Sequence, residues 1–442
     1  MDTIFALSSA PGRAGVALVR ISGPAAFAAV SALTGKSAPA ARRAVLRRLR
    51  DPQSGVELDQ AIVVAFPAPH SFTGEDVVEL HLHGGRAVLR AVVGALAAQS
   101  GLRPAEAGEF TRRAFENGRL DLTAAEGLAD LVGADTEAQR IQALRQLGGE
   151  LGTLYDGWRA SLLRSLAHIE AHIDFPEEEL PAGLVAQTQV ELVRLQRELA
   201  AHLNDQRRGE RLRDGVSVAI LGAPNVGKSS LINKLAGREA AIVSAHAGTT
   251  RDVIEVHLDL AGYPVVVADT AGLRSASDEV ESEGVRRALD RAERADIRIL
   301  MFDATALPAV DAATVALAND AAMVVINKVD LVAPGRGVTV GGKTAFAVSA
   351  RSGDGIEELV SALTAGVVEM VGIRAEPVLT RARHRHALEE CRQALERAAA
   401  AEAVELLAED LRLAVRAIGR ITGRVDVEDL LDIVFREFCI GK

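Results

Sequence analysis

The stretch Val216-Ser-Val-Ala-Ile-Leu-Gly-Ala-Pro-Asn-Val-Gly-Lys-Ser-Ser230 decides the fold of the central part of the chain. It begins with an apolar run typical of a buried strand and leads into a segment with helical spacing from Leu231. The spacing G-x-x-x-x-G-K-S predicts a phosphate-binding loop. Its two glycines allow backbone N–H groups to surround an oxyanion. Lys228 is expected to reach the β and γ phosphates, and Ser229 offers a hydroxyl to Mg²⁺.

Four further motifs follow in the order expected of a GTPase. Gly248-Thr-Thr-Arg-Asp252 offers a threonine hydroxyl to Mg²⁺, and Asp269-Thr-Ala-Gly272 follows an apolar strand. Asn327-Lys-Val-Asp330 follows another strand, and a carboxylate at Asp330 can accept the paired N–H donors of guanine, which adenine lacks. Ala347-Val-Ser-Ala-Arg351 completes the base pocket. We therefore predict a Ras-like P-loop GTPase domain over 215–370, with a mostly parallel sheet flanked by helices.

One position differs from the usual small GTPase. Leu273 stands where Ras-type enzymes place a glutamine that orients the attacking water, and leucine can neither orient nor polarise water. Either hydrolysis is slow or another group acts. Asn225 can hold a monovalent cation near the phosphates. The acidic stretch Ser277-Asp-Glu-Val-Glu281 can supply a carboxylate, or can merely solvate the start of a helix.

Length and composition limit the number of domains and the location of the protein. At 442 residues the chain is expected to form about three domains, and its 48% hydrophobic content supplies their cores. No apolar run has the length of a membrane span, and the N-terminus lacks the features of a signal peptide. Cys391 and Cys439 have no metal-ligand spacing, so the sequence predicts a reducing, cytoplasmic location.

The net charge of −10 argues against a general nucleic-acid coat, although arginines cluster locally. Solvated surfaces are the usual explanation for such runs, with RNA contact as the alternative. The clusters are Arg42, Arg43, Arg47, Arg48 and Arg50; Arg207, Arg208, Arg211 and Arg213; and Arg381, Arg383 and Arg385.

Residues 1–118 have the pattern of an α/β unit. Strands are predicted at 15–21, 59–66 and 76–83, and a helix is predicted at 87–96. Polar residues concentrate near the intervening loops; each alone is consistent with a surface or strand-edge position, and together they can line a small-molecule cleft. They are Arg20, Glu75, Glu79, His81, His83, Glu109 and Arg119.

Helical spacing dominates on both sides of the GTPase segment. Apolar residues recur at helical spacing over 120–132, 136–173 and 185–203, and again over 382–400, 404–421 and 427–438. Neither flank suffices for a complete domain. We therefore predict one discontinuous helical domain from 119–210 and 373–442, into which the GTPase is inserted. His168 and His172 with Asp174 can imitate a metal site, but without an H-E-x-x-H pattern a structural role is favoured.

Taken together, these motifs resemble the MnmE (TrmE) family of tRNA uridine-modification GTPases. The resemblance extends from Ser71-Phe-Thr-Gly-Glu-Asp76 and His83-Gly-Gly85 to the terminal Cys439-Ile-Gly-Lys442. It also includes Gly108-Glu-Phe110, Arg113-Ala-Phe115, Ile173-Asp-Phe-Pro176 and the GTPase motifs. It implies an N-terminal folate-binding and dimerisation domain, a helical domain and an inserted GTPase domain.

The resemblance also implies a set of site residues. Glu281 matches the family's catalytic carboxylate, and Cys439 matches a cysteine implicated in modification. Ser229 and Thr250 match Mg²⁺ ligands, and Asn225, Ser244, His246 and Thr249 match the K⁺ site. Arg20, Glu79, Arg119 and Lys442 match contacts to 5-formyl- or methylene-tetrahydrofolate. The GTP contacts are Asn225, Val226, Gly227, Lys228, Ser229, Ser230, Ser244, Ala245, His246, Ala247, Gly248, Thr249, Thr250, Asp269, Thr270, Ala271, Gly272, Asn327, Lys328, Asp330, Ser349, Ala350 and Arg351.

Two positions depart from the family pattern. Ser244-Ala-His246 replaces the Thr-Asp-Ile often found in the K⁺ loop, so the strength of K⁺ binding is in question although backbone carbonyls can still serve. Arg119 replaces a common lysine, which keeps the charge but changes the hydrogen-bond geometry.

The resemblance implies K⁺-dependent GTP hydrolysis that drives addition of a carboxymethylaminomethyl or aminomethyl group to C5 of the tRNA wobble uridine, U34. A homodimer is expected to act with the flavoprotein MnmG, which uses FAD and NADH, in a heterotetramer or larger complex. The alternative is a GTPase switch in ribosome assembly or regulation, which needs neither the folate-like domain nor Cys439-Ile-Gly-Lys442. Folate binding distinguishes the two hypotheses.

Overall fold

The chain folds into two compact units of mixed α/β and helical structure. In the computed structural model, unit 1 comprises 1–129, 146–191 and 397–442, and unit 2 comprises 130–145 and 192–396. The structure describes residues 2–174, 184–237, 241–242, 255–269, 293–332, 337–372, 377–425, 431, 434–435, 438 and 441.

Unit 1 contains an antiparallel sheet with one parallel pair at its end. Its described strands run in the order β3-β4-β5-β2-β1-β6, where β1 pairs antiparallel with β2 and parallel with β6. Their bounds are β1 (Thr3–Leu7), β2 (Ala14–Ser22), β3 (Val45–Arg50), β4 (Glu57–Phe66), β5 (Val77–Gly84) and β6 (Leu102–Pro104). The predicted strands at 15–21, 59–66 and 76–83 therefore exist with small changes of boundary.

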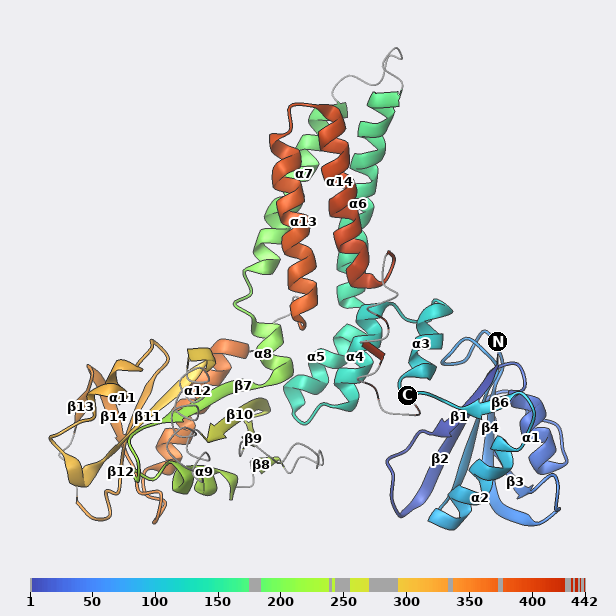
Figure 1. The fold of residues 1–442 in the computed structure, drawn as a ribbon, viewed down its shortest axis with the longest axis horizontal. Helices are drawn as coiled ribbons and strands as arrows, with labels where there is room; N and C mark the ends of the chain where they lie inside the picture. The colour runs from blue at the N-terminus through green and yellow to red at the C-terminus, as the bar shows by residue number, and fades with distance from the viewer. Residues whose placement is uncertain are drawn as a thin grey trace, which may run out of the picture. The chain divides into compact units, whose positions relative to one another are not determined.

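The two faces of this sheet differ in what covers them (Figure 1). Helices α1 (Ala26–Thr34) and α2 (Arg86–Ala97) pack on one face, where alternate strand residues such as Val19, Val63 and Leu80 are buried. On the other face, α3 (Glu109–Glu116) covers only the β1 end, through Phe110 against Ile4 and Ala6. The rest of this second face, from β3 to β2, is called the open face below.

Two long helices of unit 1 run side by side, α6 (Glu150–Asp174) and α14 (Val404–Thr422) (Figure 1). The buried side chains of α14 recur every three or four residues, including Leu407, Leu411 and Ile418, which gives one apolar stripe. The predicted helix over 136–173 is in fact two helices, α5 (Glu137–Leu147) and α6. A turn at Gly148 and Gly149 separates them, with Gly149 at φ 85°.

Unit 2 holds a sheet whose central strands are parallel. The described strands run β13-β14-β12-β11-β7-β10-β9-β8, and the β7–β10, β7–β11, β11–β12 and β12–β14 pairs are parallel. Their bounds are β7 (Val216–Leu221), β8 (Ala241–Ile242), β9 (Glu255–Leu260), β10 (Tyr263–Asp269), β11 (Ile297–Asp303), β12 (Met323–Asn327), β13 (Thr339–Val340) and β14 (Lys343–Ala347).

Helices lie on both faces of this sheet, as in P-loop domains (Figure 1). Helices α9 (Lys228–Ala236) and α12 (Ile356–Val371) pack on one face, with Leu231 and Leu363 in its core. The short α11 (Ala312–Ala316) lies over the other face, and η1 (Ala304–Ala306) follows β11. Helix α8 (Arg208–Asp214) leads into β7. The predicted fold class, a multidomain α/β and helical protein with a P-loop domain, is confirmed.

Each of the remaining helices contributes residues to both units. They are α4 (Leu122–Val132), α5, α7 (Leu184–Leu203) and α13 (Ala382–Ala400). The predicted domain boundaries at 118, 210 and 373 stay predictions. None of the described helices is both long and apolar enough to cross a membrane.

Candidate nucleotide and cofactor sites

The nucleotide motifs of unit 2 meet at one edge of its sheet. In the parallel register, Ile220 pairs with Asp269, Leu221 pairs with Leu300, and Asp303 pairs with Asn327. The carboxyl ends of these strands therefore lie in one row, and the motif residues that follow them share an edge. In open α/β sheets this edge is where ligands bind.

Two glycines give the loop between β7 and α9 the shape of an anion cradle. Gly222 and Gly227 have φ of 157° and 103°, in the region that favours glycine. A Cβ at Gly222 would lie 2.4 Å from the Met301 carbonyl oxygen, and one at Gly227 would lie 2.2 Å from the Asn327 amide nitrogen. Only glycine fits at either position, so the loop can hold its N–H groups toward a phosphate at the start of α9.

The lysine and asparagine of this loop differ in their contacts. The Lys228 ammonium donates to the carbonyl oxygens of Gly222 at 2.7 Å and Ala223 at 3.0 Å. Asn225 is exposed at φ 62°, and its carboxamide has no hydrogen-bond partner among the described residues. Its side-chain oxygen is therefore available to a cation, as the K⁺ prediction requires. Val226 is buried beneath the loop, and Ser229 and Ser230 are exposed on the first turn of α9.

Asn327 connects the phosphate-binding loop to the predicted base pocket. Its amide nitrogen donates to the Val226 carbonyl at 2.7 Å, and its amide oxygen accepts from the Ala350 N–H at 2.9 Å. Asn327 itself is 3% exposed. The side chain therefore fixes two loops against each other at the end of β12.

The acid predicted to bind guanine lies beside this bridge. Asp330 is exposed and accepts a hydrogen bond from the Ser349 hydroxyl at 2.7 Å. That bond uses Oδ1 and orients the carboxylate. Arg351 follows on the same loop and is exposed. The structure thus brings the Asn327–Asp330 and Ser349–Arg351 segments together, as the base pocket requires.

Sequence reasoning missed the carboxylate that positions Lys328. The Lys328 ammonium contacts Asp303 Oδ2 at 2.6 Å, and Lys328 has φ 68°. Burial tends to raise the pKa of the Asp303 carboxyl, but hydrogen bonds from Lys328 and Thr305 outweigh it and lower the pKa. Asp303 ends the apolar run of β11, and an acid at the end of a central strand is the signal that could have identified it.

A second cluster lies on the open face of the sheet in unit 1. Arg20 on β2 donates to Glu79 Oε1 on β5 at 2.9 Å, and both side chains are less than one-fifth exposed. His81 Nε2 lies 3.8 Å from the other Glu79 oxygen. The Arg20 guanidinium also stacks over the rings of Phe72 and Phe110, with 5.3 and 5.8 Å to the ring centroids. Sequence reasoning missed both aromatic residues as site components.

The loop over 71–75 also contacts Arg119. A Cβ at Gly74 would lie 3.4 Å from Arg119 Cγ, and the Asn117 amide donates to the Thr73 carbonyl at 2.7 Å. One loop therefore holds Phe72 against Arg20 and packs its glycine against Arg119. The predicted cleft residues Arg20, Glu79 and Arg119 are thus linked through the 71–75 loop, whereas His83 is exposed and pairs with Asp59.

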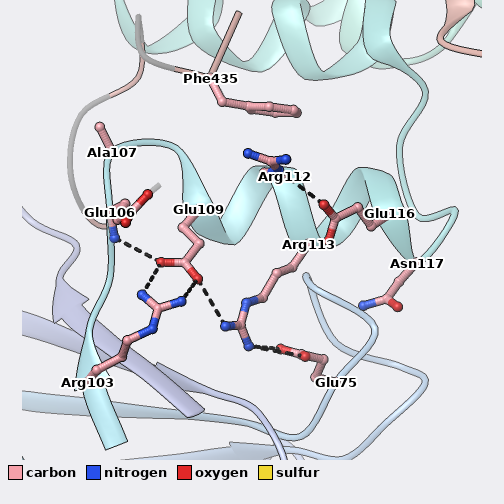
Figure 2. A pocket seen from close by; sticks show the side chains of 10 residues that line it. All are labelled: Glu75, Arg103, Glu106, Ala107, Glu109, Arg112, Arg113, Glu116, Asn117 and Phe435. Atoms are coloured by element: carbon pink, nitrogen blue, oxygen red, sulfur yellow. Dashed lines mark hydrogen bonds and ion pairs between the residues drawn. The ribbon is translucent and has the colours of Figure 1, made fainter. Parts of the chain in front are cut away.

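An ion-pair network holds the 71–75 loop through Glu75 (Figure 2). It lines a cavity of about 380 Å³ beside α3. Arg113 contacts Glu75 at 3.3 Å and Glu109 at 3.0 Å, and Arg103 contacts Glu109 at 2.5 Å. Burial tends to lower the pKa of the Arg113 guanidinium, but Glu109, Glu75 and Asp2 outweigh it and raise the pKa. The Ser22 hydroxyl donates to Glu75 at 2.7 Å, so Glu75 and Glu109 act here as structural anchors.

The end of the chain also reaches the N-terminal sheet. The Ser8 hydroxyl donates to the Gly441 carbonyl at 2.8 Å, and a Cβ at Gly441 would lie 2.0 Å from the Leu7 carbonyl oxygen. Ala6, one residue before Leu7, pairs with Arg20 across the β1–β2 ladder. This contact places Gly441 beside the strand that pairs with the Arg20 strand.

Two alternatives from the sequence concern a metal site at His168 and His172 and an RNA-binding surface at the arginine clusters. His168 and His172 are exposed on α6, and among the described residues no group of three His, Cys, Asp or Glu side chains is placed to hold a metal. The second and third arginine clusters are largely paired: Arg207 with Glu210, Arg211 with Asp296, Arg213 and Arg381 with Asp130, and Arg385 with Asp205 and Glu210.

Comparison with known proteins shows the family of the chain. The sequence profile described as GTP-binding protein TrmE N-terminus matches residues 3–119, and that of the MnmE helical domain matches residues 122–439. The tRNA modification GTPase MnmE of Paramagnetospirillum magneticum is 58% identical over 441 residues, covering 100% of each chain. The chain belongs to the MnmE (TrmE) family of tRNA modification GTPases.

Other MnmE-family relatives match over the same length. The MnmE of Parvibaculum lavamentivorans is 59% identical over 448 residues and 100% of both chains. The human mitochondrial protein named 5-taurinomethyluridine-[tRNA] synthase subunit GTPB3 is 49% identical over 458 residues, covering 100% of this chain and 93% of its own. The predicted membership and the GTPase assignment are confirmed.

Part of the MnmE site prediction lies outside the described residues. Asp269 ends β10, but only its backbone position is described. The predictions that cannot be located are Ser244, Ala245, His246, Ala247, Gly248, Thr249, Thr250, Thr270, Ala271, Gly272, Glu281, Cys439 and Lys442. Their roles stay predictions.

Proposed function

We propose that this chain is a K⁺-dependent GTPase that drives addition of a carboxymethylaminomethyl or aminomethyl group to C5 of the tRNA wobble uridine. In this proposal a one-carbon tetrahydrofolate supplies the methylene carbon. The observation that carries the proposal is the presence, in one chain, of a phosphate cradle at Gly222–Ser229 and, on a separate sheet, of the paired Arg20 and Glu79 of the predicted cleft.

The nucleotide part rests on the row of motifs at the sheet edge. The cradle and Lys228 suit phosphates, and Asp330 suits guanine. Asn225 has a free carboxamide for K⁺, and Ser229, on the first turn of α9, would hold Mg²⁺ together with Thr250. Because Leu273 cannot orient water, we assign that task to Glu281, aided by the K⁺ charge.

The cofactor part rests on the Arg20 cleft. A folate carries a flat, hydrogen-bonding ring system and carboxylates, which match an acid, a guanidinium and nearby aromatic rings. Glu79 offers acceptor oxygens, and Arg20 and Arg119 offer donors. The contact of Gly441 with Leu7 supports a role for Lys442 and Cys439 near this cleft.

The proposed assembly is a homodimer that acts with the flavoprotein MnmG, which brings FAD and NADH. At the β2 end of the open face Val16 is 57% exposed, which supports contact with a second copy there. The name of the human relative, a 5-taurinomethyluridine-[tRNA] synthase subunit, supports uridine C5 as the modified position.

The decisive experiment is nucleoside mass spectrometry of tRNA from cells that lack this chain. We expect the wobble-uridine modification to disappear and to return with the wild-type chain. Arg20→Gln should fail to restore it, because the cleft loses its central guanidinium. Arg90→Gln, which changes an exposed arginine on α2, is the matched control and should restore it fully.

Two outcomes would refute the proposal. Unchanged wobble uridine in the deletion strain would remove the modification role. If the purified chain also bound no tetrahydrofolate by equilibrium dialysis, the ribosome-assembly alternative would be favoured. Restoration by Arg20→Gln with retained folate binding would instead refute only the assignment of the cleft.

A further inference from the structure

The N-terminal part of unit 1 has a charge balance opposite to that of the whole chain. From Thr3 to Arg50 the sequence contains no aspartate or glutamate, although the complete chain has a net charge of −10. The cations of this segment concentrate at its end, from Lys36 to Arg50. A local excess of positive charge therefore persists on an acidic protein.

The structure places these cations along the outer edge of a sheet. β3 is the terminal strand, paired only with β4 among the described strands, and Arg42 and Arg43 lie in the turn that leads into it. Arg42, Arg43, Arg48 and Arg50 are exposed, and we call these four residues the arginine edge. Arg47 is half-buried and is not part of it.

The arginine edge lacks the carboxylate partners that the other clusters possess. Arg42 donates to the His70 carbonyl oxygen at 2.9 Å, and no ion pair is formed by Arg43, Arg48 or Arg50 with any described residue. Glu57 is the cross-strand neighbour of Arg50, yet its carboxylate accepts from Gln60. Asp51 accepts from the N–H groups of its own turn.

The arginines therefore fall into two groups, those paired with carboxylates of the fold and those whose guanidinium groups can bind a ligand. Arg207, Arg211, Arg213, Arg381 and Arg385 hold α8 and the start of α13 through carboxylates, so their charge is neutralised within the fold. Those of the arginine edge are exposed and uncompensated. An exposed guanidinium that is not held by a carboxylate is well suited to bind phosphate, which it can contact with two parallel N–H groups.

We propose that the arginine edge binds the phosphate backbone of tRNA. This inference rests on the proposed function, because it names the surface by which the tRNA substrate is held. Contacts of this kind position an RNA without reading its sequence. They suit an enzyme that must hold a whole tRNA while one of its uridines is modified. Arg48 is on the open face with Arg20 and Glu79, and Arg50 continues the same strand.

The test compares two triple variants that lose the same charge. Arg43, Arg48 and Arg50 are changed to Gln in one variant. In the control, Arg140, Arg194 and Arg412 are changed to Gln, since each is about half exposed and paired with an exposed glutamate. Binding of a full-length tRNA transcript to the intact chain is measured by fluorescence anisotropy from 50 to 200 mM KCl.

We expect the arginine-edge variant to bind tRNA at least about tenfold more weakly than the control. The slope of log Kd against log salt should fall by about 2, because each lost phosphate contact removes about 0.7–0.9 from it. GTP hydrolysis without tRNA should be the same in both variants. Arg→Lys at the three positions should restore most of the slope, since the charge returns.

Three results would overturn the inference. Equal tRNA affinity and slope in both triple variants would show that the arginine edge does not touch RNA. Loss of the dimer in the arginine-edge variant, seen by light scattering, would assign these residues to contact between copies. Aggregation with unchanged tRNA binding would mean that they only protect an exposed strand edge. If the wild-type chain itself bound no tRNA, the proposed function would fail as well.

Discussion

Asn327 shows how a residue chosen for one role can perform another. The resemblance includes Asn327 among the GTP contacts, and in the structure its amide contacts the backbone of Val226 and Ala350. It therefore acts as a brace that sets the distance between the phosphate-binding loop and the base pocket. Its partners are one backbone carbonyl and one backbone N–H, so the side chain in this place must both donate and accept.

Asn327→Ala is expected to lower the affinity for GTP by at least about tenfold. The change leaves two backbone groups without their partner, which costs about 1–3 kcal/mol when they are buried. The measurement is titration with a fluorescent GTP analogue. Asn233→Ala, on the exposed side of α9, is the control and should bind normally. Equal affinities for the two variants would show that the brace has no effect on binding.

At this scale the sequence predicts residue types better than their contacts. Arg20 and Glu79 were predicted in one cleft because polar residues concentrate near the loops, and the register places the two opposite each other. Phe72 and Phe110 were not expected there. Their stacking on Arg20 depends on the path of a loop and on the packing of α3, which no local pattern records. Asp303 was missed for the same reason, since its partner is 25 residues away.

At the scale of elements, periodicity located helices and strands but not all of their interruptions. The run 136–173 keeps helical spacing through Gly148 and Gly149, because apolar residues recur on both sides in phase. The break comes from the backbone of Gly149, whose positive φ ends the helix. By contrast, 382–400 has no such residue and its predicted bounds match α13.

The junction of α7 with α13 contains a histidine whose pKa makes the local stability depend on pH. Burial lowers the pKa of His202 to about 4; the Asp205 charge opposes this shift, whereas His384 and Arg385 add to it. His202 is therefore neutral in the folded protein near pH 7. Unfolding raises its pKa toward 6.5, so its contribution is complete above that value and falls as the pH drops toward 4.

Lowering the pH from 7.5 to 5.0 should reduce the free energy of local unfolding of α7 and α13. The reduction should be about 2 kcal/mol larger in the wild type than in His202→Gln. Hydrogen exchange of peptides from these helices measures it directly. Trp158 belongs to unit 1, so its fluorescence is not a suitable probe. His386→Gln is the control on the exposed side of α13, where 74% of the imidazole is accessible, and it should behave as the wild type. An identical pH dependence in His202→Gln would contradict the assignment.

For the whole molecule, the family resemblance implies that K⁺-dependent GTP hydrolysis is linked to dimerisation of the GTPase domains. Leu273 removes the usual means of orienting water, and Asn225 offers an oxygen that nothing else in the described structure uses. The family resemblance indicates the order of the domains and their chemistry. It does not indicate how strongly Ser244-Ala-His246 binds an ion, because that depends on backbone carbonyls rather than on residue type.

GTP hydrolysis should therefore be faster in KCl than in NaCl at equal ionic strength, by about tenfold or more if the ion replaces an arginine finger. With GDP and aluminium fluoride, light scattering should show association of the GTPase domains in K⁺ only. Asn225→Ala should abolish the difference between the two salts, whereas Asn233→Ala should preserve it. The same rate in both salts for the wild type would exclude the ion from the mechanism.

The contact between Gly441 and the first strand bears on how the protein is made. Ser8 and Gly441 are 433 positions apart, yet one hydrogen bond joins them. During translation the N-terminal sheet emerges early and can fold at once. Gly441 leaves the ribosome 433 residues after Ser8. A nascent chain stalled before residue 441 would therefore carry a folded sheet that still lacks its contact with Gly441.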